Sequence, residues 1–330
     1  MRRLSQICIL LGLALFAVVL WQADLGDGMA RLAGVGWAAL GLVAVYAGVM
    51  LLDSVVWLIA WPGVPLNPRW LGRLMLARLI GEAVNGVTPG GLAGEPVKLT
   101  LLHRRHGLDL QAGVASVVVG RTLNLLGLLP FIALGLALTV SQASVSPALQ
   151  WAAVVTLLAL TGGVAAFFAI QRLALSSQGA GWLSRWLAGG RFQQAITAIR
   201  AVEDGVIGFY RGHPLRLVAG ASVGFAQFCF SVLEGWLALA LLGQPVDYAT
   251  ALMLEALVQL VRTSTFFVPG NLGTQDGAFV VLARELGLVG SLGLGVAVLR
   301  RFRELVFTLA GFGCGLIFSV EGLSRPPPKR

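Results

Sequence analysis

Residues 263–279 read TSTFFVPGNLGTQDGAF and separate two apolar runs that are each shorter than the roughly 20 residues of a membrane-spanning helix. Proline and glycine at 269 and 270 stop a helix, and Asp276 adds a carboxylate to the same stretch. Backbone that leaves the helix inside a bilayer must be buried in protein or line a watery cavity, because lipid cannot hydrogen-bond it. The stretch therefore predicts a re-entrant hairpin, a helix-break-helix segment that faces an internal cavity.

A similar break lies nearer the start of the chain, where residues 88–95 read TPGGLAGE. It follows a moderately apolar helix expected at 69–87, and Glu95 supplies its carboxylate. Too few residues separate Pro68 from His103 for two complete spans, so this segment is also expected to enter the membrane and return to the same side. Seven residues are expected to form the two turns: Pro89, Gly90, Gly91, Gly94, Pro269, Gly270 and Gly273.

The composition is that of a membrane protein. Of 330 residues, 57% are hydrophobic and 12% are charged, whereas soluble domains carry about 25% charged residues. We predict an all-α polytopic transmembrane bundle that forms a single integral membrane domain over residues 1–330, with a disordered basic tail at 322–330. Spans are expected at 4–22, 35–60, 112–140, 151–171, 215–243 and 290–318.

The positive charge follows the expected membrane topology. The net charge is +9, and with a cytoplasmic N-terminus about 17 of the 24 Lys and Arg fall in or beside cytoplasmic segments. This distribution explains the charge without a nucleic-acid partner, and the HRRH sequence at 103–106 predicts contact with anionic lipid headgroups. Residues 172–214 carry one apolar face, which predicts either an interfacial amphipathic segment or a helix that packs on the spans.

The two breaks lie in units of similar organisation, a first re-entrant unit at 69–140 and a second at 248–318. In each unit a carboxylate follows the break proline by six or seven residues, and an arginine in the next span follows it by 32 or 31. Each leading helix carries one polar stripe; the stripes are Arg78, Glu82 and Asn85, and Glu255, Gln259 and Arg262. Paired broken helices that enter from opposite sides are typical of transporters, so we predict an inverted repeat.

Four charged residues, at 300, 301, 303 and 304, lie inside the last expected span, although each costs at least about 2.5–3.5 kcal/mol at the bilayer centre. One interpretation is a structural cluster in which Arg300 pairs with Glu304 and Arg303 pairs with Asp276. The other is a cationic pocket for a phosphate or another anionic headgroup, because three arginines exceed what Glu304 alone can neutralise.

Two sets of candidate site residues follow from these patterns. The substrate-binding candidates are Arg300, Arg301, Arg303, Glu304, Arg121, Arg262 and Glu255. The candidates for charge or proton coupling are Glu95, Asp276 and Glu82, and for Glu95 and Asp276 the alternative role is to cap the helix that follows. No metal or cofactor is expected, because the sequence shows no nucleophile-base pair, phosphate-binding lysine loop or metal-ligand set.

These residues resemble the lysylphosphatidylglycerol synthase transmembrane, or flippase-like, family. The resemblance rests on PGNLGTQDGA at 269–278 followed by Arg300, and on Asn85, PGG at 89–91 and Glu95 in the earlier break. The sequences LE at 254–255 and LRRFRE at 299–304, together with Arg262, are more similar still to the family's hopanoid-biosynthesis-associated membrane branch. Many relatives carry Glu where this chain carries Asp276, which keeps the charge and shortens the side chain.

The resemblance implies a lipid translocase of the bacterial inner membrane that handles hopanoid or another polar or anionic lipid. The aminoacyl-transferase domain of the synthases is not expected here, so synthase activity is not implied. Two alternatives stay open: a non-transporting scaffold of a lipid-biosynthesis complex, and an intramembrane enzyme that modifies an isoprenoid or lipid headgroup. The expected partners are the lipid substrate, anionic lipid headgroups, and either a second copy of the chain or lipid-biosynthesis enzymes.

Overall fold

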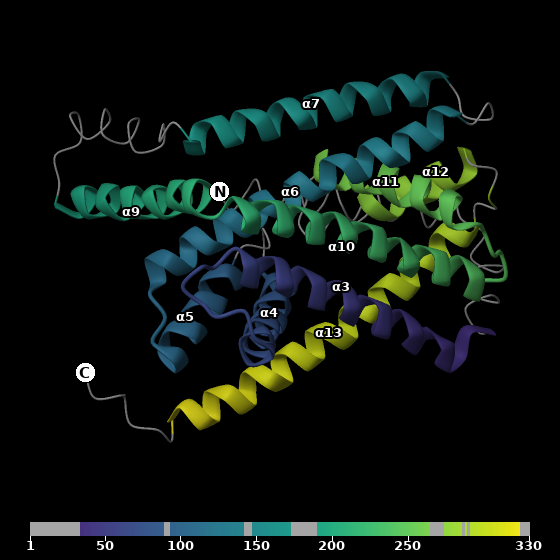
Figure 1. Ribbon diagram of the computed structural model, residues 1–330. Coiled ribbons are helices and arrows are strands. Elements are labelled where there is room, and N and C mark those ends of the chain that lie inside the picture. The colour runs from purple at the N-terminus through teal and green to yellow at the C-terminus, as the bar shows by residue number, and fades with distance from the viewer. Residues whose placement is uncertain are drawn as a thin grey trace. The chain divides into compact units, whose positions relative to one another are not determined.

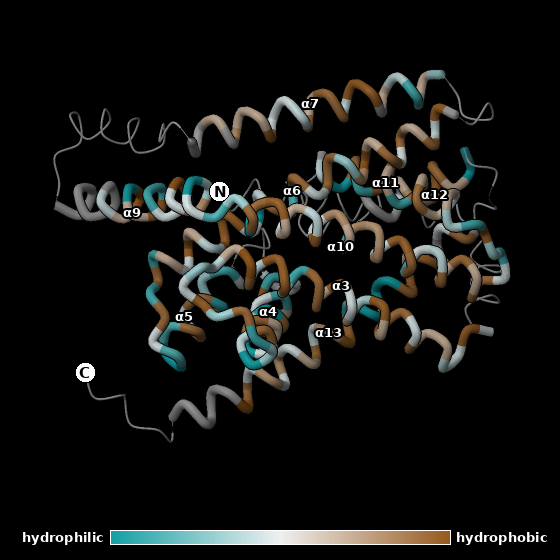
Figure 2. Tube along the Cα trace, viewed as in Figure 1, coloured by the Kyte–Doolittle hydropathy of each residue, from teal (hydrophilic) through white to brown (hydrophobic). Residues whose placement is uncertain are grey.

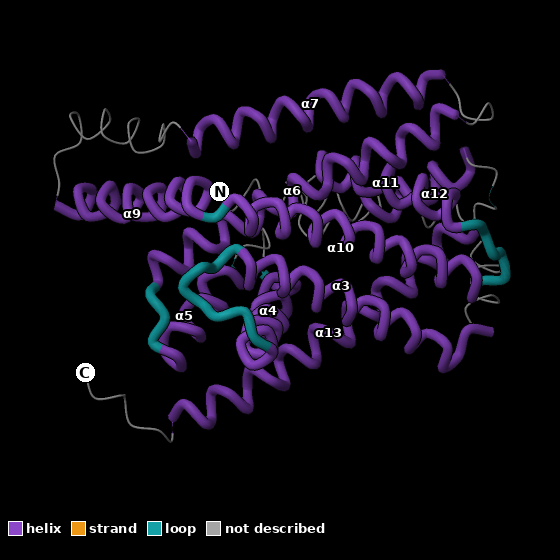
Figure 3. Tube along the Cα trace, in the orientation of Figure 1, coloured by secondary structure: helices purple, strands orange, loops and turns teal. Residues whose placement is uncertain are grey.

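The structure is a computed structural model that describes residues 34–88, 93–141, 147–172, 190–264, 274–285, 288 and 291–323. These residues form helices joined by turns and loops, with no strand in the described part of the chain (Figure 3). The all-α prediction is therefore confirmed. The span expected at 4–22, the turn residues of both breaks other than Gly94, and most of the basic tail lie outside the described residues.

The helices alternate with short connections along the whole described chain (Figure 1). In chain order they are a 3-10 turn η1 (Gly36–Ala39), α3 (Leu40–Ile59), α4 (Pro68–Val87), α5 (Gly94–His106), α6 (Leu110–Ser141), α7 (Pro147–Arg172), α9 (Gly190–Gly212), α10 (Pro214–Leu241), α11 (Tyr248–Ser264), α12 (Thr274–Glu285) and α13 (Ser291–Leu323).

Four helical segments are long and apolar enough to cross a membrane: Gly36–Ile59, Leu110–Val140, Gln150–Phe167 and Pro214–Leu241. They correspond to the spans expected at 35–60, 112–140, 151–171 and 215–243. Figure 2 shows apolar residues dominating α7 and α10, whereas polar residues gather on α5 and α9. α13 is a single helix of 33 residues, and four of its charged residues lie at 300–304 in its first half.

The start of α4 illustrates how local sequence sets a boundary. α3 ends at Ile59, and the proline-rich stretch that follows forms a loop up to α4. Pro68 is the first residue of α4, a position where a backbone N–H has no acceptor within the helix, so proline loses no hydrogen bond there. The Asn67 side chain caps the helix by accepting a hydrogen bond from the backbone N–H of Trp70 over 2.9 Å.

Both predicted breaks separate two helices. α4 ends at Val87 and α5 begins at Gly94, while α11 ends at Ser264 and α12 begins at Thr274. Because α12 starts before residue 276, the backbone of Asp276 lies in the first turn of this helix and not in the break itself. Membrane re-entry and the inverted repeat stay predictions.

The described chain divides into two compact units, and helices α3, α4, α5 and α10 contribute residues to both. The first unit comprises Met1–Ala47, Gly72–Leu101 and Val232–Arg330, and the second comprises Gly48–Leu71 and Leu102–Ser231. In the first unit α12 packs against both α11 and α13. α13 also approaches α4 at Gly311, where an added Cβ would lie 2.5 Å from the Leu79 carbonyl oxygen, so only glycine fits.

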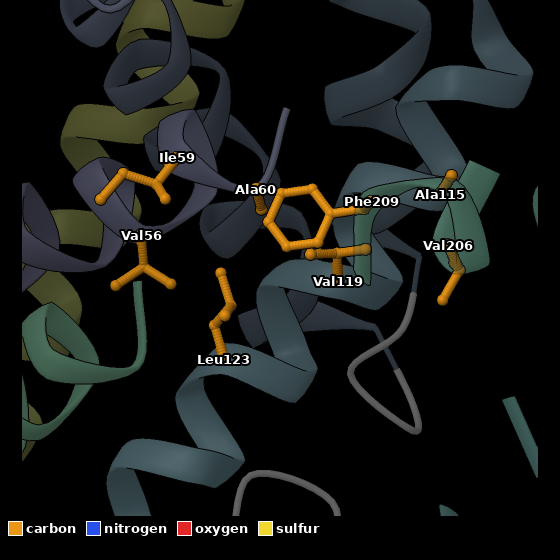
Figure 4. Packing of buried hydrophobic residues seen from close by; sticks show 8 residues of the cluster. All are labelled: Val56, Ile59, Ala60, Ala115, Val119, Leu123, Val206 and Phe209. Atoms are coloured by element: carbon orange, nitrogen blue, oxygen red, sulfur yellow. The ribbon is translucent and has the colours of Figure 1, made fainter. Parts of the chain in front are cut away.

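The second unit has an apolar core between α3, α6 and α9 (Figure 4). Its members are Val56, Ile59, Ala60, Ala115, Val119, Leu123, Val206 and Phe209. Val206 and Phe209 come from the predicted amphipathic helix, whose residues Arg200 and Asp204 are exposed. This contact with α6 is what the packed-helix alternative expects, and an interfacial position of the segment stays a prediction.

Candidate functional site

The candidate site surrounds the predicted arginine cluster at residues 300–304 of α13. This stretch belongs to the first of the two compact units. Arg300 and Arg303 stand three residues apart on one face and are only 6% and 7% exposed. Burial of charge at this level requires nearby counter-charges, because an isolated ion cannot recover its lost hydration inside a protein. The partners come from α10, α11 and α13 itself.

Arg300 pairs with Glu255 of α11. Its Nη2 donates to the Glu255 carboxylate over 2.6 Å, and its Nε lies 3.9 Å from an oxygen of Glu234 on α10. The Phe279 ring of α12 covers the guanidinium at 5.3 Å from the ring centroid. The polar stripe predicted on the helix before the second break therefore does reach the arginine cluster through Glu255.

Arg303 pairs with Glu234, and this partner was not among the predicted site residues. Its Nη1 donates to the Glu234 carboxylate over 2.6 Å, and its Nη2 donates to Glu304 over 3.3 Å. The guanidinium also lies over the ring of Tyr46 on α3, 3.9 Å from the centroid. Such a cation-π contact suits arginine, because the guanidinium plane can face the negative surface of the ring.

Arg301 and Glu304 form a more accessible edge to the cluster. Arg301 Nη1 donates to the Glu304 carboxylate over 2.7 Å, and the two side chains are 31% and 43% exposed. The cluster thus has a buried inner part and a partly exposed outer part along the same helix. We call the inner residues, Arg300, Arg303, Glu234 and Glu255, the inner ionic cluster.

The described residues supply more counter-charge than Glu304 alone. Three arginines of α13 face three glutamates, because Glu234 and Glu255 add to Glu304. Arg300 binds Glu255, and Glu304 lies against Arg301 and Arg303, while the pair of Arg300 with Glu304 stays a prediction. The side chain of Asp276, the predicted partner of Arg303, lies outside the described residues.

Glu82 of α4 and Arg262 of α11 belong to the two predicted polar stripes. Glu82 lies 3.7 Å from Arg78 one helical turn away, and Arg262 is largely exposed. The part of these two candidates in a substrate site stays a prediction.

The remaining candidate of the first break, Glu95, lies in the first turn of α5 and is paired. Its carboxylate lies 2.8 Å from Nζ of the buried Lys98, one turn further along the helix. The charges of Arg78 and Glu82 act on the same lysine. Lys98 was missed as a site residue because, in the sequence, it is one more basic residue beside the HRRH stretch.

The first break is closed by a direct contact between its two helices. The Asn85 side chain of α4 accepts a hydrogen bond from the backbone N–H of Gly94 over 2.7 Å, which caps the start of α5. A Cβ on Gly94 would lie 2.7 Å from this Asn85 oxygen and closer still to the Gly81 carbonyl oxygen. Gly94 thus allows α5 to fold back along α4, as the predicted turn requires.

Arg121 belongs to the second unit, where it lies on α6 with an exposed side chain. A half-buried polar pair on this helix involves a different residue, since Asn124 donates to Asp53 of α3 over 2.8 Å. Sequence reasoning missed Asp53, although a single carboxylate inside an apolar span is itself a signal. The same signal was present in Glu234, which stands alone within α10.

Comparison with known proteins identifies the family. Residues 9–311 match the family described as the lysylphosphatidylglycerol synthase TM region. No curated protein and no solved structure matches the chain. The match covers nearly all of the sequence and agrees with the apolar helices that are long enough to span a membrane. The chain is therefore a multi-pass membrane protein and belongs to the lysylphosphatidylglycerol synthase transmembrane-region family.

Proposed function

We propose that this protein translocates a polar lipid between the leaflets of the bacterial inner membrane, with the lipid headgroup passing through the inner ionic cluster. The observation that carries the proposal is the burial of two arginine-glutamate pairs between α10, α11 and α13, each with a nitrogen-oxygen distance of 2.6 Å. The matched family is a lipid-related membrane family, which supports a lipid as the ligand.

Stability alone explains this cluster poorly. Replacing a buried ion pair by well-packed apolar residues is often neutral or stabilising by about 1–4 kcal/mol. Leu and Met at these four positions would remove the cost of burying charge, and neighbouring helices already pack through apolar residues. Retention of four buried ions is better explained by a ligand that interacts with them.

The arginines of the cluster can exchange their glutamate partners for a lipid headgroup. The glutamates Glu234 and Glu255 hold the arginine forks while the site is empty, and a polar headgroup can take over part of these contacts during passage. The broken helices supply the movable elements, since α5 and α12 each begin after a break. In this proposal the two re-entrant units open the cluster to one leaflet at a time, with the N-terminus in the cytoplasm.

The proposed substrate includes hopanoid or another polar lipid, as the resemblance of residues 254–304 to the hopanoid-associated branch implies. Candidate partners are lipid-biosynthesis enzymes or a second copy of the chain. Glu95, Glu82 and Asp276 are proposed to couple charge or protons to the movement. This role is supported by the ion pairs that Glu95 forms with the buried Lys98 over 2.8 Å and Glu82 forms with Arg78 over 3.7 Å.

A proteoliposome assay tests the translocase. The purified chain is reconstituted with a fluorescent lipid, and the fraction of lipid that a membrane-impermeant quencher reaches is followed over time. Wild type is expected to move lipid, and Arg300→Ala and Asp276→Ala to move it at least tenfold more slowly. Wild-type rates in both variants would reject the assigned roles, and Arg284→Ala on the exposed end of α12 is the matched control.

The scaffold alternative has one specific observation in its favour, namely the balance of three arginines against three glutamates. A scaffold requires only that the cluster folds, so the double variant Arg300→Met with Glu255→Leu is expected to keep its function. A translocase is expected to lose transport in the same folded variant. An enzyme is distinguished by the appearance of a chemically altered lipid in the reconstituted vesicles.

A further inference from the structure

Glu234 and Arg303 of the inner ionic cluster each have a buried polar atom with no hydrogen-bond partner in the described part of the chain. These atoms are the second carboxylate oxygen of Glu234, Oε1, and the Nε–H of Arg303. The other atoms of these side chains are engaged, since Glu234 Oε2 accepts from Arg303 Nη1 and Arg303 Nη2 donates to Glu304. Both residues are more than nine-tenths buried. The site therefore holds one acceptor and one donor that are available to a polar ligand.

A ligand that satisfies both atoms must donate one hydrogen bond and accept another. The carboxylate oxygen requires a hydrogen-bond donor, whereas the guanidinium N–H requires an acceptor. Glu234 Oε1 lies 3.9 Å from Arg300 Nε, a separation longer than a hydrogen bond. A group placed here can bridge the two side chains without displacing either ion pair.

This pattern discriminates among headgroup chemistries. A phosphate ester carries at least one negative charge at neutral pH, so its oxygens can accept from Arg303 but would bring that charge against the Glu234 carboxylate. A quaternary or primary ammonium offers no acceptor to Arg303. Hydroxyl groups both donate and accept, and they add no net charge to a cluster in which three arginines already face three glutamates.

We infer that the headgroup recognised by the inner ionic cluster is uncharged and carries several hydroxyl groups. One hydroxyl donates to Glu234 Oε1, and another accepts from the Nε–H of Arg303. The inference rests on the proposed function, in which a lipid enters the cluster. It narrows the substrate to lipids whose headgroup is a polyol or a sugar and excludes lipids whose headgroup is a phosphate.

Binding measurements on the full chain test this selectivity. The protein is placed in phosphatidylcholine nanodiscs and titrated with three probes that share one diacylglycerol body: galactosyl-diacylglycerol, phosphatidate, and acetyl-diacylglycerol, which has no hydroxyl. Bound lipid is counted by native mass spectrometry, and the unfolding midpoint is followed in parallel. The galactosyl lipid is expected to bind at least tenfold more tightly than either other probe. Equal or tighter binding of phosphatidate or of the acetyl lipid overturns the inference.

A variant links the selectivity to the incomplete atoms. Arg303→Lys keeps the charge but removes the Nε–H donor, so affinity for the galactosyl lipid is expected to fall at least tenfold. The control Arg284→Lys makes the same exchange at an exposed position of α12 and is expected to leave binding unchanged. An unchanged affinity in a folded Arg303→Lys protein overturns the inference, because ordered water then suffices to complete the site. If this variant does not fold, the ranking of the three probes on wild type decides alone.

A transport assay with the same probes separates this inference from the proposed function. Movement of phosphatidate without movement of the galactosyl lipid overturns the inference and leaves the translocase intact. Selective binding of the galactosyl lipid with no movement of any probe supports the recognition and rejects the translocase.

Discussion

Arg303 of α13 lies over the ring of Tyr46 of α3, with 3.9 Å between the guanidinium carbon and the ring centroid. The same arginine binds Glu234 over 2.6 Å, so its plane is held on one side by an aromatic ring and at one end by a carboxylate. Tyr46 also contacts the Phe307 ring edge-on at 4.8 Å between centroids. A residue inside an otherwise apolar run of α3 thus positions the central cation of the candidate site.

The first prediction concerns this stacking contact. Tyr46→Leu removes the ring and is expected to destabilise the protein by about 0.5–2 kcal/mol beyond the loss of packing, because a buried cation-π contact has this magnitude. Tyr46→Phe keeps the ring and is expected to stay close to wild type. Thermal unfolding midpoints of the three proteins in one detergent measure the difference. Equal midpoints for the Leu and Phe variants would show that the ring serves only to fill space.

The second prediction contrasts the inner and outer ion pairs. Glu255→Gln removes the carboxylate that lies 2.6 Å from the buried guanidinium of Arg300 and is expected to cost about 3–5 kcal/mol of stability. Glu304→Gln acts on a pair that is 31% and 43% exposed, so a cost of about 0–1 kcal/mol is expected.

The double variant Arg300→Met with Glu255→Leu provides the control for the inner pair. Removal of both ions is expected to recover most of the stability lost in Glu255→Gln, since no unpaired charge remains. Unfolding in a series of denaturant concentrations gives the free energies. A double variant as unstable as the single one would mean that the cost arises from packing and not from charge.

The ends of the helices were predictable because residues within a few positions of each end determine where the helix begins or stops. The proline-rich loop after α3, the capping Asn67 and the Pro-Gly stretches that separate α4 from α5 and α11 from α12 all act within a few residues. The charged segment of α13 was also predictable, since four ions inside an apolar helix have a high cost. These features need no knowledge of which helices become neighbours.

The partners within the site were not predictable in the same way. Glu234 and Arg303 are 69 residues apart in the chain, and Glu255 and Arg300 are 45 apart, so only tertiary packing shows that they pair. Tyr46 looks like any aromatic residue of an apolar span. The charge of the cluster was judged from neighbours in the sequence, which could not show that glutamates of α10 and α11 lie beside the arginines.

The third prediction tests the turn between α4 and α5. Gly94→Ala places a Cβ 2.7 Å from the Asn85 side-chain oxygen and against the Gly81 carbonyl, so one of the two helices must move. We expect a loss of about 1–3 kcal/mol, the usual cost of forcing extra volume into a tight contact. The matched control is Gly208→Ala on the exposed side of α9, where nothing lies within 4 Å of an added Cβ. That change is expected to stabilise by about 0.5–1 kcal/mol, because alanine favours the helix. Similar effects of the two substitutions would argue against a close contact at Gly94.

The last prediction concerns the pH dependence of the cap at the start of α11. Asp247 precedes this helix, and its carboxylate accepts hydrogen bonds from the hydroxyl and, over 3.4 Å, the backbone N–H of Thr250. These bonds favour the charged form and hold the pKa of the Asp247 carboxyl below its ordinary value. Because the folded-state pKa is the lower one, the stabilisation is complete above the unfolded-state pKa and is lost as the pH falls through the folded-state pKa.

We therefore expect Asp247→Ala to lower stability by about 1 kcal/mol at neutral pH, where the charged cap is fully formed. The difference from wild type should shrink as the pH falls into the range where aspartate carboxyls become protonated, near pH 4 and below. Thermal unfolding of both proteins from pH 3 to pH 7 measures this, and Asp204→Ala on the exposed face of α9 controls for the loss of a surface charge. A difference that stays constant across the whole pH range would mean that Asp247 contributes through its shape and not through its charge.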